Sequence, residues 1–401
     1  MCLCQDQRRH RVANCFEFNH NMTFNCFGQS ACQNDAQCFQ DSPNCPQRSM
    51  CVCPACYYGT RCQFTTTIFT LSLDAILGYH IRPHLKITQQ PSIVQISVVL
   101  TTIFILVGLV NGILDLLTFK SQVIRNVGCG HYLFATSITT LLITMMFALK
   151  FWILVLAQMQ VITNRSFLSF QCHSLDYFLQ LLLNTDRWLN ACVAVERTIT
   201  MVKGVRFNKE KSKQIAKWMV CILVIVIAVT GLDDPSYSRL IDDENEDENR
   251  IWCVVSYPSS VQKLSSTINI FHFVTPFLLN LVSAIILIAE KSRQRLSLQI
   301  NRSYNEVLRE EFRHYKHLLI APIALVIIAL PSLIFSFISK CLKSSSSSWL
   351  FLTGYLISML PPMLTFFIFV LPSQFYRTEL RATIARYRRN VIGYFHRMSF
   401  R

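Results

Sequence analysis

Residues Cys172 to Arg197 read CHSLDYFLQLLLNTDRWLNACVAVER, and this stretch decides the fold. As a helix rising about 1.5 Å per residue it would extend roughly 37 Å, enough to cross a hydrocarbon core of about 30 Å. Polar residues recur along it mostly at spacings of three or four, which places them on one face. They are Asp176, Gln180, Asn184, Arg187, Asn190 and Arg197. Because a charge facing lipid is costly, we expect this face to point into a protein bundle or a wet cavity.

The composition is that of a protein that crosses a membrane several times. Of the 401 residues, 52% are apolar and only 15% are charged, which argues against a soluble enzyme. Seven apolar segments are each long enough to span a bilayer. They cover residues 92–118, 131–157, 170–195, 214–232, 264–289, 316–340 and 349–372. Since every backbone amide in a bilayer must bond internally, the predicted fold is an all-α seven-transmembrane helix bundle over residues 92–372.

The net charge of +15 would suit a nucleic-acid partner, but the basic residues are distributed asymmetrically. Seven Lys or Arg residues fall in each of the segments 197–217, 291–316 and 377–401, whereas the connection 233–263 holds eight acidic residues. By the positive-inside rule we expect a multi-pass plasma-membrane protein with an extracellular amino terminus and a cytoplasmic carboxyl terminus. A basic face that meets anionic membrane lipid accounts for most of the charge, so no nucleic-acid partner is expected. Residues 373–401 are predicted to be an amphipathic cytoplasmic helix and tail.

Eleven of the 17 cysteines precede Gln63, which for an extracellular segment indicates a disulfide framework. A zinc site at Cys51, Cys53 and Cys56 is the alternative, but the oxidising side of a membrane disfavours free thiolates. We therefore expect no metal and no cofactor. Residues 1–25 are interpreted as an extracellular tail and residues 63–91 as a stalk. The polar start of the chain indicates that either the first span carries the tail across or the true beginning is missing.

Several further residues are candidates for function. Asn21 and Asn164 each begin a glycosylation triplet on the predicted outside. Lys150, near the outer end of the second span, either snorkels to the interface or pairs with Asp176. The candidate ligand pocket is formed by Lys150, Asp176, Gln180 and His272. Prolines inside the last three spans predict kinks that allow the bundle to flex; they are Pro276, Pro331 and Pro362.

The cysteines between residues 26 and 62 resemble an EGF-like module. The resemblance rests on the spacing of Cys26, Cys32 and Cys38, on Cys51-x-Cys53, and on the closing run Tyr57-Tyr58-Gly59-Thr60-Arg61-Cys62. It implies the bridges Cys26–Cys38, Cys32–Cys51 and Cys53–Cys62, with Cys45–Cys56 as an additional fourth. So small a unit buries little core, so it would depend on its bridges, each worth about 2 to 4 kcal/mol.

The rest of the chain resembles rhodopsin-like (class A) G-protein-coupled receptors. The resemblance rests on seven spans with an outside amino terminus, on Cys172 with Cys253, and on Glu196-Arg197-Thr198 at the inner end of the third span. Cys253 is also the only cysteine left outside the membrane to partner Cys172. The resemblance implies that Glu196 holds Arg197 at rest and that Arg197 meets a G protein on activation. It further implies that Val205 enters the G protein and that the three prolines match those of the family.

The chain departs from that family at three motifs. Ile138 or Thr139 replaces the sodium-binding aspartate of the second span, with Asp186 near by, and Ala329 replaces the tryptophan of the sixth. The seventh span has Leu360-Pro361-Pro362-Met363-Leu364-Thr365 where the family has Asn-Pro-x-x-Tyr. Leu179 stands where amine receptors carry an aspartate, so a biogenic amine is not expected as the ligand.

Three classes of function follow. The leading one is a receptor that passes an extracellular signal to heterotrimeric G proteins, with a basic peptide steered by the acidic connection as the ligand. The alternative is adhesion or recognition by the EGF-like module, with a signalling-impaired bundle as the anchor. A transporter would use Asp115, Asp176, Asp186 and Arg187, but no inverted repeat is evident. No phosphate loop or catalytic constellation is present, so we expect no enzyme.

Overall fold

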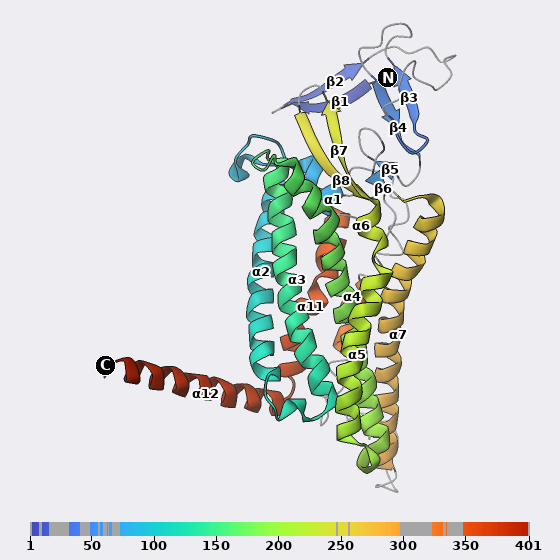
Figure 1. The fold of residues 1–401 in the computed structure, drawn as a ribbon. Coiled ribbons are helices and arrows are strands. Elements are labelled where there is room, and N and C mark those ends of the chain that lie inside the picture. Colours follow the sequence, from blue (N-terminus) through green and yellow to red (C-terminus); the bar gives the residue numbers. More distant parts are fainter. Residues whose placement is uncertain are drawn as a thin grey trace.

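The computed structural model describes residues 2–7, 10–15, 32–40, 49–54, 57–58, 62, 64–65, 73–245, 248–255, 257–296, 323–331, 334 and 348–399. The predicted sites at Asn21, Cys26, Cys45 and Cys56 lie outside these residues. Figure 1 shows long, roughly parallel helices with short strands at one end and a projecting helix near the other. We call these the strand end and the Arg197 end.

Five long helices form most of the bundle. They are α2 (Ser92–Phe119), α3 (Gly128–Gln158), α4 (Arg165–Lys203), α5 (Lys209–Thr230) and α7 (Ser259–Leu296). Short elements connect them: η3 (Ile124–Asn126), η4 (Gly204–Arg206) and α6 (Asp233–Tyr237). The third span predicted from the sequence is α4, whose amino terminus is capped by the exposed Asn164 through a hydrogen bond from the Phe167 amide. Each of the seven predicted spans therefore corresponds to helical structure in the described residues. For the sixth and seventh spans the correspondence is partial.

The sixth and seventh spans are less regular. Of the predicted sixth span the structure describes helical residues 323–331 and residue 334, which is also helical. The seventh is divided into α10 (Ser348–Ser358), α11 (Leu360–Met363) and the π-helix η6 (Phe366–Val370). Helix α12 (Gln374–Ser399) then leaves the bundle at a steep angle (Figure 1). An interrupted seventh helix is expected where Pro361 and Pro362 remove backbone donors.

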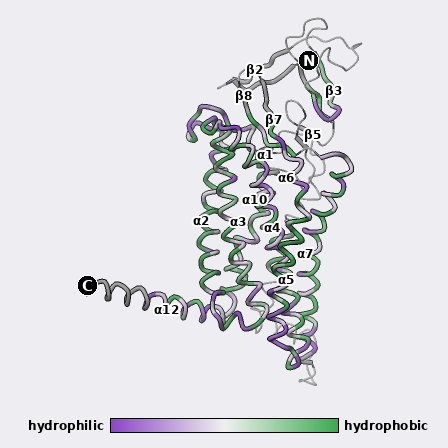
Figure 2. Tube along the Cα trace, viewed as in Figure 1, coloured by the Kyte–Doolittle hydropathy of each residue, from purple (hydrophilic) through white to green (hydrophobic). Residues whose placement is uncertain are grey.

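Hydropathy agrees with a membrane position for the bundle. Within the described part of the chain, four helices are long and apolar enough to cross a membrane: 92–119, 128–158, 209–237 and 260–290. Figure 2 shows apolar residues along α2, α3, α5 and α7, with hydrophilic residues gathered toward their ends. Helix α4 is not among the four because its polar stripe lowers its mean hydropathy. This helix lies between α3, α5 and α7, which shield its polar face from lipid.

Two apolar clusters fill the bundle, one toward each end. At the strand end, residues of α2, α3, α4, α10 and α11 pack together around Phe147 and Phe151. At the Arg197 end, Phe119, Leu133, Leu189 and side chains of η6 form the second cluster. Buried polar side chains lie on the same helices between these clusters. The core of the bundle therefore has one apolar cluster toward each end, and polar side chains follow α4.

The strands form four separate antiparallel pairs. Three precede the bundle: β1 (Cys2–Gln7) with β2 (His10–Cys15), β3 (Gln37–Gln40) with β4 (Ser49–Val52), and β5 (Tyr57–Tyr58) with β6 (Phe64–Thr65). Disulfides join Cys32 to Cys51 and Cys53 to Cys62. Cys38 is also disulfide-bonded. The EGF-like identity of this region stays a prediction.

The predicted stalk, residues 63–91, differs from the expectation. Helix α1 (Leu73–Leu77) and the 3-10 turn η1 (Gly78–His80) are buried within the bundle, and η2 (Ile87–Gln89) leads back to α2. The reason is the apolar spacing of Leu73, Ile76 and Leu77, which places three large side chains on one face of a single helical turn. A segment with such a face gains more by burial than by extension in water.

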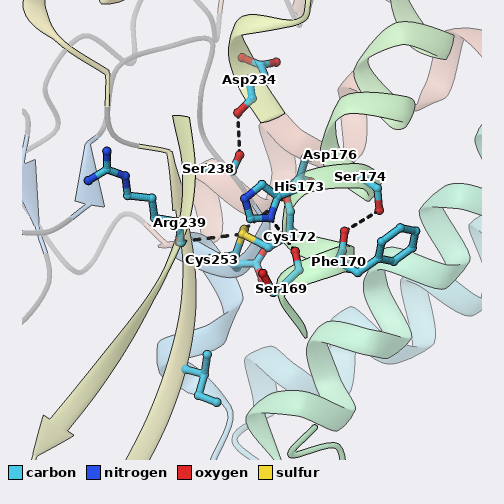
Figure 3. The surroundings of a disulfide bond; sticks show 12 residues. Ser169, Phe170, Cys172, His173, Ser174, Asp176, Asp234, Ser238, Arg239 and Cys253 are labelled. Carbon is cyan, nitrogen blue, oxygen red and sulfur yellow. Dashed lines mark hydrogen bonds between the residues drawn. A yellow bond between two sulfur atoms is a disulfide. The ribbon is translucent and has the colours of Figure 1, made fainter. Parts of the chain in front are cut away.

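The fourth strand pair is a hairpin that a disulfide ties to α4 (Figure 3). Strand β7 (Ser238–Asn245) pairs with β8 (Glu248–Val255), and Cys253 of β8 bonds to Cys172 with a Cα separation of 5.5 Å. Both cysteines are buried. The Ser238 hydroxyl donates to the Asp234 carbonyl at 2.7 Å, which holds the base of the hairpin against α6. The predicted acidic connection is therefore a hairpin fixed over the strand end of the bundle.

Replacing Cys253 by serine should release this hairpin. A bridge of this kind contributes about 2 to 4 kcal/mol to stability, so the variant should be cut by trypsin within residues 238–255 several-fold faster than the natural protein. The measurement is limited proteolysis of receptor displayed on cells, followed by mass spectrometry. Cys221→Ser, at an exposed unbonded cysteine of α5, is the control. Equal cleavage rates for the two variants would contradict the tether.

Candidate functional site

Lys150 is the centre of a buried charge cluster at the strand end. Its ammonium lies 2.8 Å from an oxygen of Asp176 on α4 and 2.5 Å from an oxygen of Asp74 on α1. Lys150 is only 1% exposed, whereas the Asp176 side chain is 32% exposed. Of the two alternatives open from the sequence, pairing with Asp176 is the one that the structure adopts. Burial of an amine is tolerated here because two carboxylates surround it.

Asp74 was not expected from the sequence, because residues 63–91 were interpreted as a stalk. A signal was present in Leu73-Asp74-Ala75-Ile76-Leu77, where one carboxylate stands among apolar residues at helical spacing. Burial also lowers the pKa of His80 at the end of this segment, so its imidazole stays neutral near pH 7. The segment therefore brings one negative charge and no compensating cation to Lys150.

The other two predicted pocket residues have different surroundings. Gln180 is half-buried about one turn along α4 from Asp176. His272 on α7 is buried between Trp188 and Thr230: the indole N–H donates to its Nδ1 at 3.0 Å, so its Nε2–H donates to the Thr230 hydroxyl at 2.9 Å. Both ring nitrogens are occupied, and His272 joins α4 to α5 and α7. It belongs to the packing of the bundle rather than to the Lys150 cluster.

A second polar cluster lies deeper in the bundle. The Asp186 carboxylate accepts a hydrogen bond from Asn190 at 3.0 Å and lies 3.2 Å from the Thr139 hydroxyl. On α2, Asp115 accepts a hydrogen bond from Thr365 at 2.5 Å. Within the described residues no group of three His, Cys, Asp or Glu side chains is arranged to hold a metal ion. Asp186 does lie beside Thr139, which is one of the two residues, with Ile138, that could stand at the position of the family's aspartate.

The broken seventh helix is held by side chains of α2 and α3. The Asn111 amide donates to the Met363 carbonyl, and the Thr140 hydroxyl lies 3.3 Å from the Pro362 carbonyl. In α7, Asn280 donates to the carbonyl of Pro276 at 2.9 Å. Neighbouring side chains thus satisfy carbonyls at the prolines. Pro276 lies inside the continuous helix α7, Pro362 lies inside α11, and Pro331 lies in the described part of the sixth span; their role as hinges stays a prediction.

Glu196 joins three helices at the Arg197 end. Its carboxylate accepts a hydrogen bond from Ser212 on α5 and interacts with the backbone amides of Gly128 and Cys129, which begin α3. A carboxylate at a helix amino terminus is stabilised by the unpaired amides and the helix dipole. A side chain at Gly128 would place its Cβ 2.7 Å from the Glu196 oxygens. The absence of a side chain at residue 128 is what permits this close approach.

Arg197 does not form the expected contact with Glu196. Its guanidinium lies 5.2 Å from the centre of the Phe369 ring on η6 and interacts with Cys129 and Tyr376. Successive side chains on a helix point about 100° apart, so Glu196 faces α3 and α5 while Arg197 faces the seventh helix and α12. The resting contact implied by the family resemblance is therefore replaced by an Arg197 to Phe369 cation–π contact.

Thr198 and Val205, the other two residues predicted to act in G-protein coupling, differ in burial. Thr198 is buried, and its hydroxyl bonds to the Ala194 carbonyl at 2.9 Å and approaches the Ser283 carbonyl of α7 at 3.4 Å. Val205, in η4, is fully exposed. An exposed apolar side chain in the connection that follows α4 is available to a protein partner. Thr198 therefore has a packing contact, and Val205 is free to bind.

A protein-family model described as 7 transmembrane receptor (rhodopsin family) matches residues 110–368, from α2 to η6. The chain belongs to the rhodopsin family of seven-transmembrane receptors. No curated protein was found to match it. This rhodopsin-family receptor is accordingly a multi-pass plasma-membrane protein, and its family consists of receptors rather than enzymes. The match ends before α12 and begins after α1, so it covers neither the Asp74 segment nor the three strand pairs that precede the bundle.

Replacing Lys150 by methionine should destabilise the receptor. The change leaves the Asp74 and Asp176 carboxylates close together without a cation, and removing one partner of a buried ion pair costs about 3 to 5 kcal/mol. We expect several-fold lower surface display and a lower melting temperature in detergent. Lys203→Met, at the exposed end of α4, is the matched control. If both variants behave like the natural receptor, the charge cluster does not support the fold.

Proposed function

We propose that this receptor passes a signal from an extracellular ligand to heterotrimeric G proteins. The observation that carries the proposal is the Arg197 end, where the half-buried Arg197 contacts Phe369 of the broken seventh helix and the connection η4 that follows α4 exposes an apolar residue, Val205. The strand end then faces outside and the Arg197 end faces the cytoplasm. The basic helix α12, which carries exposed Phe375 and Ile384, lies along the anionic inner leaflet.

Signal transfer would proceed by a change in packing between the two ends. The α10–α11–η6 segment contacts the apolar cluster at the strand end through Leu352 and Met359, and Arg197 through Phe369. A ligand that prefers one arrangement of the strand end shifts the population of the other end by its differential affinity. Because the seventh helix is already interrupted at Pro361 and Pro362, it can move without loss of regular hydrogen bonds. Release of Arg197 from Phe369 would free it for a G protein.

The ligand is proposed to be a basic peptide. Six of the acidic residues between Asp233 and Lys263 fall from Asp242 to Glu248, around the tip of the β7–β8 hairpin. Clustered carboxylates attract cations over roughly a Debye length of 8 Å at physiological ionic strength. A hairpin fixed over the strand end by the Cys172–Cys253 bridge would deliver such a peptide to the bundle.

Adhesion is the second candidate, because the disulfides at Cys32–Cys51 and Cys53–Cys62 build a separate module ahead of the bundle. The departures at Ala329 and at the Glu196–Arg197 contact also favour it. In that case the module would bind an extracellular partner and the bundle would serve as an anchor. The two candidates differ in whether Arg197 matters to any cellular response.

Arg197→Ala should abolish G-protein activation at equal surface display. The assay is activation of each G-protein class in cells, measured without addition and with a pool of basic extracellular peptides. Loss of the guanidinium removes the group proposed to meet the G protein, so we expect at least a tenfold lower signal. Arg389→Ala, on α12 and far along the chain from the bundle, is the control. A signal that persists in Arg197→Ala, or no signal from any well-displayed version, would favour adhesion.

Val205→Asp should weaken coupling without changing stability. The side chain is fully exposed, so a charge costs nothing in the free receptor but must be desolvated against an apolar G-protein surface. We expect a several-fold loss of G-protein activation with an unchanged melting temperature. Val161→Asp, at an exposed valine beyond the other end of α3, is the matched control. Equal signals from the two variants would exclude Val205 from the interface.

A further inference from the structure

The segment of residues 73–81 occupies the interior of the bundle at its strand end. Leu73, Ile76, Leu77 and Ile81 are buried members of the same apolar cluster as the helices. They pack with Phe147 and Phe151 of α3, Leu179 and Leu183 of α4, and Leu352, Leu356 and Met359 of the seventh helix. A part of the chain that precedes the first span therefore inserts its side chains among at least three spans.

One ion pair gives this inserted segment a defined register. Asp74 lies 2.5 Å from Lys150, and among the described residues Asp176 is the one other ion-pair partner of Lys150. Apolar packing by itself tolerates sliding by a turn, whereas a buried carboxylate must meet its cation. The bundle thus offers an apolar surface with one lysine, and the segment presents an apolar face with one carboxylate. The segment and the bundle are thus complementary in apolar surface and in charge, as a ligand and its binding site are.

The chain holds the segment in place from both sides. Gln90 accepts from the Arg82 amide at 2.8 Å and donates to the Arg82 and Leu85 carbonyls at 2.7 and 3.1 Å, which closes the return to α2. Trp252 of the hairpin covers the segment at residue 78: a Cβ there would lie 2.5 Å from the indole ring. Gly78 is therefore the residue that permits the hairpin to close over the segment.

We propose that residues 73–81 are a ligand of this receptor built into its own chain, bound at a site that recognises an apolar peptide carrying one carboxylate. Only the signalling consequence of this inference rests on the proposed function; the binding itself does not. A short tether gives the bound segment an effective concentration on the order of millimolar, so a free peptide must compete with it. A diffusible basic peptide would then act from outside, on the acidic hairpin.

The proposal is tested by emptying the site and refilling it. In the full-length receptor, residues 73–81 are replaced by a Gly-Ser linker of equal length, and the fluorescent peptide SLDAILGYHIR (residues 72–82) is titrated onto displayed receptor. We expect saturable binding to the linker variant, little binding to the natural receptor, and at least tenfold weaker binding of the peptide with Asp74→Asn. No saturable binding to a well-displayed linker variant, or equal binding to both receptors, would overturn the proposal.

A charge-exchange experiment tests the same proposal if the linker variant does not reach the cell surface. Asp74→Lys should lower surface display because it sets two lysines together, and Lys150→Asp alone should lower it because it sets three carboxylates together. The double variant restores one cation between two carboxylates and should recover display. Unchanged display in the Asp74→Lys variant, or no recovery in the double variant, would show that the segment is not bound at Lys150.

The same peptide separates this inference from the proposed function. If it binds the linker variant and changes G-protein activation, both stand. If it binds with the expected charge dependence but changes no G-protein signal, the built-in ligand stands and G-protein coupling fails. If it does not bind while Arg197→Ala still abolishes signalling in the natural receptor, coupling stands and the built-in ligand fails.

Discussion

The polar face of α4 cannot be left in contact with lipid, and much of the packing around this helix serves to satisfy it. Asp176 meets Lys150 of α3, and Arg187 lies 4.9 Å from the Phe273 ring of α7 while donating to Asn184 at 2.7 Å. Trp188, Glu196 and Thr198 reach His272, Ser212 and Ser283 on the neighbouring helices. Because an unsatisfied polar group costs several kcal/mol in hydrocarbon, these contacts select one arrangement of helices around α4.

The same constraint shapes the seventh helix. Two consecutive prolines lack the backbone N–H that a regular helix would donate, and side chains of α2 and α3 contact the Met363 and Pro362 carbonyls of this segment. The seventh helix is therefore held in part by side chains of other helices. It also lies between the apolar cluster at the strand end and Arg197, so it is the element through which the two ends can be coupled.

At the strand end, three parts of the chain that are distant in sequence converge on one place. The segment before the first span inserts Asp74, α3 supplies Lys150, and the hairpin after α5 closes over them with Trp252. The Cys172–Cys253 bridge holds the hairpin to the helix that also carries Asp176. Covalent, ionic and apolar contacts thus support one another, and loss of any one weakens the position of the others.

Much of this receptor was determined by the sequence alone. Length and hydropathy predict the spans, because a bilayer requires internally bonded helices of about 20 residues, and the charge asymmetry predicts their orientation. The polar spacing of Asp176, Asn184 and Arg197 places them on one face of α4 for purely geometric reasons. The partner of Cys172 could also be reached from the sequence, since Cys253 is the only cysteine outside the predicted spans and their edges once the amino-terminal cysteines are set aside.

Only the tertiary structure decided which groups meet. Lys150 could reach the interface or Asp176, and no local pattern ranks contacts between separate helices. Glu196 was expected to hold its neighbour Arg197, but the two side chains point to different helices, and Ser212 and the amides of α3 offered the carboxylate better partners. The sequence predicts a stalk around Asp74, because the ion pair of Asp74 with Lys150 exists only in the folded bundle. Local periodicity specifies the elements, whereas the pairing of buried charges depends on how those elements pack.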